Sequence, residues 1–112
     1  MTIYKIFRRA EWADLAAKGE TLGAPVDLAD GYIHFSTAQT LRATAEKWFV
    51  GEMDLILCAC DPETFGDALK WEPARGGVLF PHLYRPLRLS EVLWHQPMGD
   101  SISGFLFPDE IE

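Results

Sequence analysis

The sequence predicts an α+β domain in which early helices pack on a mainly antiparallel sheet. Apolar residues recur at helical spacing in two segments of the first half, 10–18 and 36–49. Strand-like runs dominate the second half, where Gly, Pro and Asp separate short apolar or alternating segments. Helices in one part of a chain and strands in another are typical of the α+β class. The length of 112 residues, with no repeat or linker, indicates a single domain over 1–112.

The N-terminal part is expected to form a strand and then a helix. Residues 2–7 alternate between two sets of side chains, as the two faces of a strand do. Residues 10–18 place apolar side chains at helical spacing, and Gly19 is a typical position for the end of a helix. A loop follows, and residues 28–31 are expected to form a turn.

A second strand and a second N-terminal helix are expected next. Residues 32–35 have the composition of a short strand. Ser36, with Gln39 three residues later, matches a capping box, so a helix is expected to begin at Ser36, or at Thr37 if that residue is the cap. This helix is expected to end at Gly51.

Strands are expected through the second half. Residues 53–60 are almost continuously apolar, which is typical of a strand in the middle of a sheet. Pro81 cannot donate a ladder hydrogen bond, so the segment around it is expected outside a central position. The remaining strands are expected at 68–72, 78–84, 90–96 and 103–107, with a turn or short helix opening at 61–63.

Charge and composition exclude several classes of function. The formal net charge of −7 argues against general nucleic-acid binding, which needs clustered Lys and Arg, but it leaves room for a small phosphorylated ligand. No apolar run approaches the ~20 residues of a membrane helix, and no secretion signal is apparent, so a cytoplasmic protein without membrane contact is expected. Cys58 and Cys60 share one strand face and are expected to be buried thiols rather than a disulfide or a zinc site.

The first candidate site surrounds His34. Alternation places Tyr32, His34 and Ser36 on one face of the strand, opposite its apolar residues. A helix beginning at Ser36 or Thr37 would add free backbone N–H groups, which bind anions. These residues therefore predict a cradle for phosphate or ribose. The alternative is that His34 only bonds a backbone carbonyl and that Ser36 only caps the helix.

The second candidate site surrounds His82. Pro81 fixes the backbone beside it, Tyr84 lies on the same side of an extended chain, and Arg85 suits a phosphate, which together indicate an anionic or nucleotide ligand. The alternative is a surface loop held by prolines. Glu72, at a strand end, would suit a general base if burial raised its pKa, and would otherwise be solvated.

Other motifs are absent from the sequence. It has no glycine-rich phosphate loop, no GxSxG elbow and no metal-ligand spacing, so no metal is expected. His95 lacks evident partners and is interpreted as structural.

Four motifs together resemble a bacterial family known as domain of unknown function 952. They are IYKI at 3–6, GYIHFSTAQ at 31–39, KWE at 70–72 and FPHLYRPL at 80–87. The similarity extends over nearly the whole chain. That family is itself distantly similar to the ADP-ribosyltransferase superfamily, especially its RNA 2′-phosphotransferase branch. His34-Phe35-Ser36 is similar to the H-x-S-like motif of that branch, and Lys5 stands where the superfamily usually has a first-strand histidine.

The resemblance implies an ADP-ribosyltransferase-like fold and an ADP-ribosyl or phosphoribosyl-type transferase that uses NAD as a substrate. Its chemistry would be cleavage of the nicotinamide–ribose bond. It implies catalytic roles for His34, Glu72 and His82, and ligand-binding roles for Lys5, Ser36 and Tyr84. The local sequence patterns add Tyr32, Thr37 and Arg85 as ligand-binding candidates. Two alternatives stand beside this transferase. One is a non-catalytic domain that binds a nucleotide or another small molecule, and the other is an enzyme of another class that uses the two histidines and Glu72 as acids and bases.

Overall fold

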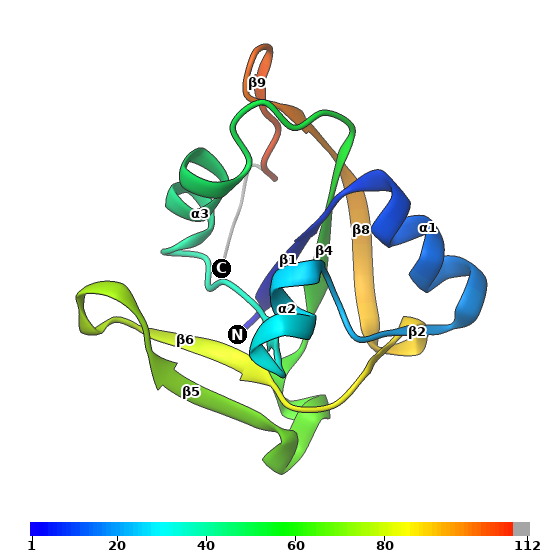
Figure 1. Ribbon diagram of the computed structural model, residues 1–112, viewed down its shortest axis with the longest axis vertical. Helices are drawn as coiled ribbons and strands as arrows, with labels where there is room; N and C mark the ends of the chain where they lie inside the picture. The colour runs from blue at the N-terminus through cyan, green and yellow to red at the C-terminus, as the bar shows by residue number, and fades with distance from the viewer. Residues whose placement is uncertain (109–112) are drawn as a thin grey trace.

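The computed structural model describes residues 1–108, and its chain alternates short helices with short antiparallel strands (Figure 1). The α-helices are α1 (Arg9–Lys18), α2 (Pro25–Asp30) and α3 (Leu41–Trp48). The strands are β1 (Ile3–Phe7), β2 (Glu20–Thr21), β3 (Ile33–His34), β4 (Leu55–Cys60), β5 (Leu69–Pro73), β6 (Leu79–Leu83), β7 (Leu87–Arg88), β8 (Val92–Asp100) and β9 (Gly104–Phe105). Short 3₁₀ helices are η1 (Pro62–Ala68), η2 (Arg75–Gly77) and η3 (Leu89–Glu91).

Within residues 1–108 the strands form three antiparallel sheets instead of one. The largest has the order β1-β4-β8-β9, the second pairs β2 with β7, and the third has the order β3-β6-β5. A bridge between Tyr4 and Ser36 joins β1 to the segment that follows β3. The α+β class and the antiparallel pairing are therefore confirmed. The central position expected for residues 53–60 is also confirmed, because β4 lies between β1 and β8.

Strand β1 is buried on both faces and separates two hydrophobic clusters. Ile3 and Phe7 pack with α1 and with the inner face of the β3-β6-β5 sheet. Tyr4 and Ile6 pack with α3 on the other side. Figure 1 shows α1 and α3 accordingly on opposite sides of the four-stranded sheet. The β3-β6-β5 sheet thus has one face in the core and an outer face free for other roles.

Two side-chain expectations about structural residues agree with this packing. Cys58 and Cys60 are free and buried in β4, where burial raises the pKa of Cys60 to about 12. Such thiols stay protonated and unreactive at neutral pH. His95 stacks on Trp12 of α1 with ring centroids 4.2 Å apart, which gives it a structural contact.

The segment expected to be a turn at 28–31 is instead the end of a third helix, α2. Pro25 occupies its first turn, where the missing N–H costs nothing, and Gly31 ends it with a φ of 85°. Only six residues long, α2 shows too little periodicity to be recognised as a helix from apolar spacing.

The helix expected at Ser36 begins five residues later, at Leu41. Ser36 instead exchanges two backbone hydrogen bonds with Tyr4, at 2.7 and 2.8 Å, and so continues the strand-like path. A tertiary pairing outweighs the local capping signal here, and it removes the helix N-terminus expected beside His34.

Pro81 lies in β6, the central strand of its sheet, contrary to the expectation for the segment around it. Its carbonyl accepts a hydrogen bond from Phe35 N at 3.0 Å. Because N–H and C=O of one residue point to the same side in an antiparallel ladder, the missing N–H faces Phe35, just beyond the end of β3. The proline therefore leaves the Phe35–Pro81 pair with this single bond.

No helix within residues 1–108 combines the length and apolar character needed to cross a membrane.

Candidate functional site

The register of the small sheet brings His34 and His82 face to face. His34 of β3 pairs directly with His82 of β6, and their ring centroids lie 5.2 Å apart. Residues two apart along a strand share a face, so Tyr32 and Tyr84 lie beside the two histidines. Glu72 of β5 joins them diagonally, since its own register partner is Phe80. The neighbours Ile33 and Leu83 point to the core, which leaves the polar groups on the opposite, outer face, where His82 is only 5% exposed.

Asp27 of α2 holds the ring of His34. Its Oδ1 accepts from Nδ1 of His34 at 2.6 Å and from the backbone N–H of the same residue at 3.1 Å. Because an ionised carboxylate only accepts, Nδ1 is the protonated nitrogen of this contact. Oδ2 of Asp30, at the end of α2, lies 3.1 Å from Nε2 on the other side of the ring. His34 is thus flanked by two carboxylates.

Asp27 is itself 1% exposed and held from several sides. Its Oδ2 accepts from Nζ of Lys5 and from the backbone N–H of Ala24, both at 2.8 Å. Burial alone would raise the pKa of this carboxyl, but the hydrogen bond from His34 and the charge of Lys5 outweigh it and lower that pKa. Asp27 is therefore a fixed negative charge behind His34.

The close approach of Asp27 to the chain requires glycine at position 23. Gly23 has a φ of +97°, and a Cβ there would overlap Oδ2 of Asp27 and lie 2.8 Å from its Cβ. We expect Gly23→Ala to lower the free energy of unfolding by about 2 kcal/mol or more, from backbone strain and displacement of the carboxylate. Urea unfolding followed by tryptophan fluorescence measures this loss.

Gly31→Ala is the matched control for that variant. Gly31 has a similar φ of +85°, but a Cβ there would meet nothing within 4 Å. It should lose only the backbone contribution, about 1 kcal/mol. Equal losses in the two variants would contradict a steric role for Asp27 at Gly23.

His82 is held by a second carboxylate, on β5. Its Nδ1 lies 2.8 Å from Oε1 of Glu72, and the hydroxyl of Tyr84 donates to the same oxygen at 2.6 Å. These bonds, from Tyr84 and then His82, lower the pKa of Glu72, and the Tyr84–Glu72 bond raises the pKa of Tyr84 to about 12. The raised pKa considered for Glu72 is thus wrong, because its partners stabilise the ionised form. Nδ1 donates to Glu72, and Nε2 of His82 has no partner among the side chains that the structure describes.

Tyr32 closes the cluster as an aromatic cover. Its ring centroid lies 4.7 Å from that of His34, 4.2 Å from that of His82 and 5.1 Å from that of Tyr84. Beside these tyrosines, a mainly apolar pocket of about 270 Å³ opens between α2 and the chain after β6. A planar ring could stack there on Tyr32 or Tyr84.

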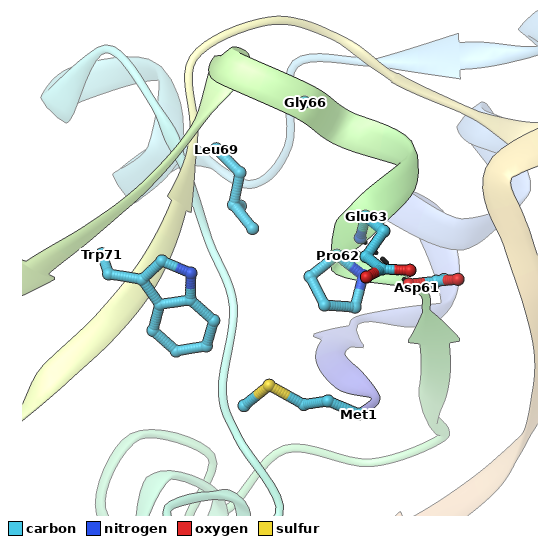
Figure 2. A pocket seen from close by; sticks show the side chains of 7 residues that line it. All are labelled: Met1, Asp61, Pro62, Glu63, Gly66, Leu69 and Trp71. Carbon is cyan, nitrogen blue, oxygen red and sulfur yellow. Dashed lines mark hydrogen bonds between the residues drawn. The ribbon is translucent and has the colours of Figure 1, made fainter.

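A larger pocket, of about 410 Å³, lies on the other side of β5 (Figure 2). It is lined by Leu69 and Trp71, which alternate with Lys70 and Glu72 and therefore face away from the histidines. In Figure 2 the remaining lining comes from Met1, from Asp61 and from η1. Neither histidine contributes to it.

Four residues expected to bind a ligand lie outside the cluster of Tyr32, His34, Glu72, His82 and Tyr84. Lys5 is buried against Asp27. Ser36 donates to Oγ1 of Thr44 at 3.3 Å, and Thr37 bonds Thr40 in the turn before α3. Arg85 forms a two-pronged ion pair with Glu91, with one contact at 3.0 Å. These side chains are engaged in structural contacts.

The sequence predicts that Tyr32, His34 and Ser36 share one face. This prediction is confirmed for Tyr32 and His34 but is wrong for Ser36. Beyond His34 the chain leaves β3 for β1, so Ser36 follows a different sheet. The structure adds Asp27 and Asp30, which the sequence did not indicate. The sequence does contain a signal for the helix that carries Asp27. A short capped helix is indicated by a proline in the first turn, an acid two residues later and Gly31 after the last turn.

Comparison with known proteins places this geometry in a family. The crystal structure of protein CC0527 from Caulobacter crescentus is 48% identical, with a TM-score of 0.89 over 94% of this chain and 92% of that one. The solution NMR structure of the same protein gives 48% identity and a TM-score of 0.81, over 93% and 90% of the two chains. A search of functionally curated proteins gives no match. The family described as protein of unknown function DUF952 matches residues 6–95. The chain therefore belongs to the DUF952 family.

Proposed function

We propose that the protein is an NAD-handling enzyme of the ADP-ribosyltransferase type, which cleaves the nicotinamide–ribose bond on the outer face of the β3-β6-β5 sheet. The observation that carries this proposal is the cluster of two carboxylate-held histidines under two tyrosine rings. The similarity of His34-Phe35-Ser36 to the superfamily motif supports it further, whereas the family description and the CC0527 structures name no activity.

The charges and aromatic faces of the cluster suit the nicotinamide ring of NAD, which is a planar cation. Tyrosine faces attract cations by cation–π interaction and also stack on flat rings. Tyr32 and Tyr84 supply such faces, and Glu72 and Asp30 supply negative charge beside them. A neutral or anionic ring would gain less from this combination.

Glu72 has the properties needed to stabilise the transition state. When the bond from C1′ of the ribose to the nicotinamide nitrogen breaks, its electron pair leaves with neutral nicotinamide and the ribose becomes an oxocarbenium cation. The lowered pKa of Glu72 keeps its carboxylate ionised at neutral pH, and Tyr84 and His82 hold it in place. Fixed charge aimed at developing charge is the most effective form of such stabilisation.

The two histidines have different roles in this proposal. The free Nε2 of His82 accepts the proton of the attacking nucleophile as that nucleophile bonds to C1′, which completes the transfer. His34, held through Nδ1 by Asp27, positions a ribose hydroxyl through Nε2, where the hydroxyl takes the place of the exposed Asp30 carboxylate. Lys5 acts on the ligand only through Asp27, so it is a positioning residue and not a ligand contact.

A second candidate is an acid–base enzyme of another class. The directly paired His34 and His82, each with its own carboxylate, favour it because such pairs serve many proton transfers. A binding domain without catalysis is the third possibility.

Incubation with NAD separates the three. The proposed enzyme releases nicotinamide, a binding domain holds NAD unchanged, and an enzyme of another class neither binds nor consumes it. Release of nicotinamide by the wild-type protein is the expected result, and intact NAD after prolonged incubation would contradict the proposed reaction.

A further inference from the structure

The cations expected to contact a phosphate are occupied elsewhere. Lys5 is paired with the buried Asp27, and Arg85, although it lines the pocket beside Tyr32 and Tyr84, is paired with Glu91. The outer face of the β3-β6-β5 sheet instead carries Glu72 and lies beside Asp30, both of which repel a phosphate. A phosphorylated ligand on this face therefore needs another positive charge.

Lys70 is placed to supply that charge. It is the only lysine or arginine within strands β3, β5 and β6, and it is the direct register partner of His82. Residues opposite each other on paired strands have their Cβ atoms about 4.5–5.5 Å apart, so Lys70 shares the outer face with His82 and Glu72. The Lys70 side chain is exposed and forms no ion pair or hydrogen bond with the side chains that the structure describes.

The charge of Lys70 already acts on the cluster. After the hydrogen bonds from Tyr84 and His82 and the charge of His82, the Lys70 ammonium makes the smallest of the contributions that lower the pKa of Glu72. Lys70 and Glu72 lie on the same face of the edge strand. If Glu72 contacts the ribose of a ligand, the Lys70 ammonium can therefore reach a phosphate attached to that ribose. The flexible four-carbon stem lets it follow a phosphate without disturbing the carboxylate.

We propose that Lys70 binds the phosphate of the ligand and makes the site select phosphorylated N-ribosides over the corresponding nucleosides. This inference rests on the proposed function, because it assigns the phosphate end of the same ligand. Lys70 is a specificity residue in this assignment, and the histidines and Glu72 act on the ribose whether or not a phosphate is present.

Two probes that differ only in the phosphate test the assignment. Backbone amide shifts are followed while the wild-type protein is titrated with nicotinamide mononucleotide and, separately, with nicotinamide riboside. We expect the mononucleotide to bind about ten- to a hundredfold more tightly, which is the range for one charge-assisted hydrogen bond. Added salt should reduce this preference, since an exposed ion pair is screened.

Three variants locate the effect. Lys70→Gln should bind the mononucleotide as weakly as the riboside while leaving riboside affinity unchanged, and Lys70→Arg should keep most of the preference. Lys18→Gln, which removes the same charge from the end of α1, should behave as wild type.

The outcomes separate this inference from the proposed function. Equal binding of the two probes at the cluster, or a preference that survives in Lys70→Gln, would overturn the role of Lys70 and leave the proposed function standing. Binding of neither probe would overturn the role of Lys70, and the proposed function would fall with it only if NAD also stays intact in the incubation described above.

Discussion

Asp27→Asn is expected to lower the free energy of unfolding by about 3–5 kcal/mol, the range for breaking a buried ion pair on one side. The variant leaves the buried ammonium of Lys5 without its counter-charge, and it weakens the bonds that Asp27 makes to His34. Urea unfolding at neutral pH measures the loss. A loss below about 1 kcal/mol would contradict a buried charge pair at this place.

The Lys5→Met variant completes a double-mutant cycle. Adding Lys5→Met to Asp27→Asn removes the unpaired ammonium. The free energy of unfolding lost in the double variant should therefore be smaller, by about 1–3 kcal/mol, than the sum of the losses in the two single variants. Strict additivity would mean that the two side chains do not interact, whatever their 2.8 Å separation.

The same pair gives a pH dependence with a defined sign. The folded-state pKa of Asp27 lies below its unfolded value, so its contribution is complete above about pH 4 and is lost as the pH falls through the lower, folded pKa. The wild type should therefore lose stability more steeply than Asp27→Asn in this acidic window. Parallel curves for the two proteins would show that Asp27 is not the group responsible.

Glu72→Gln should slow the release of nicotinamide from NAD by about 10²–10³-fold, the usual cost of removing one fixed group that stabilises developing charge. The amide is close in size to the carboxylate but carries no negative charge to oppose the oxocarbenium cation. Binding of NAD should change much less, because Tyr32 and the histidines remain. The measurement is the rate of nicotinamide release at saturating NAD.

Glu91→Gln is the matched control for that variant. It also removes a carboxylate with a lowered pKa, but this one is paired with Arg85 away from the histidines. Its rate should stay close to wild type. A Glu72→Gln enzyme as fast as Glu91→Gln would contradict the role assigned to Glu72.

Alternation along single strands was predictable from sequence, whereas the pairing between strands was not. Side chains two residues apart on a strand share a face. This rule places Tyr32 beside His34, and His82 beside Tyr84. That His34 lies opposite His82 is decided by the register of β3 and β6, which are nearly fifty residues apart along the chain. Only this tertiary pairing turns two separate motifs into one site.

Local signals failed where tertiary contacts outweighed them. The capping-box pattern at Ser36 has the right spacing, but the backbone of Tyr4 takes the hydrogen bonds that a helix would have used. Pro81 would disrupt most central strands, yet here its missing donor falls where β3 has ended. Asp27 was not recognised because α2 is too short to show a periodicity, although its buried carboxylate organises both Lys5 and His34.

The proposed function requires NAD to bind on the outer face of the β3-β6-β5 sheet. An NMR titration of isotope-labelled protein with NAD tests this binding most directly. The expected result is amide shifts concentrated at residues 32–34, 70–72 and 82–84, with none at the pocket beside Trp71 and Met1. Replacing His34 with Ala should abolish these shifts while the rest of the spectrum stays that of a folded protein. The absence of shifts at millimolar NAD, or shifts gathered around Trp71 and Met1, would contradict the assignment of this face.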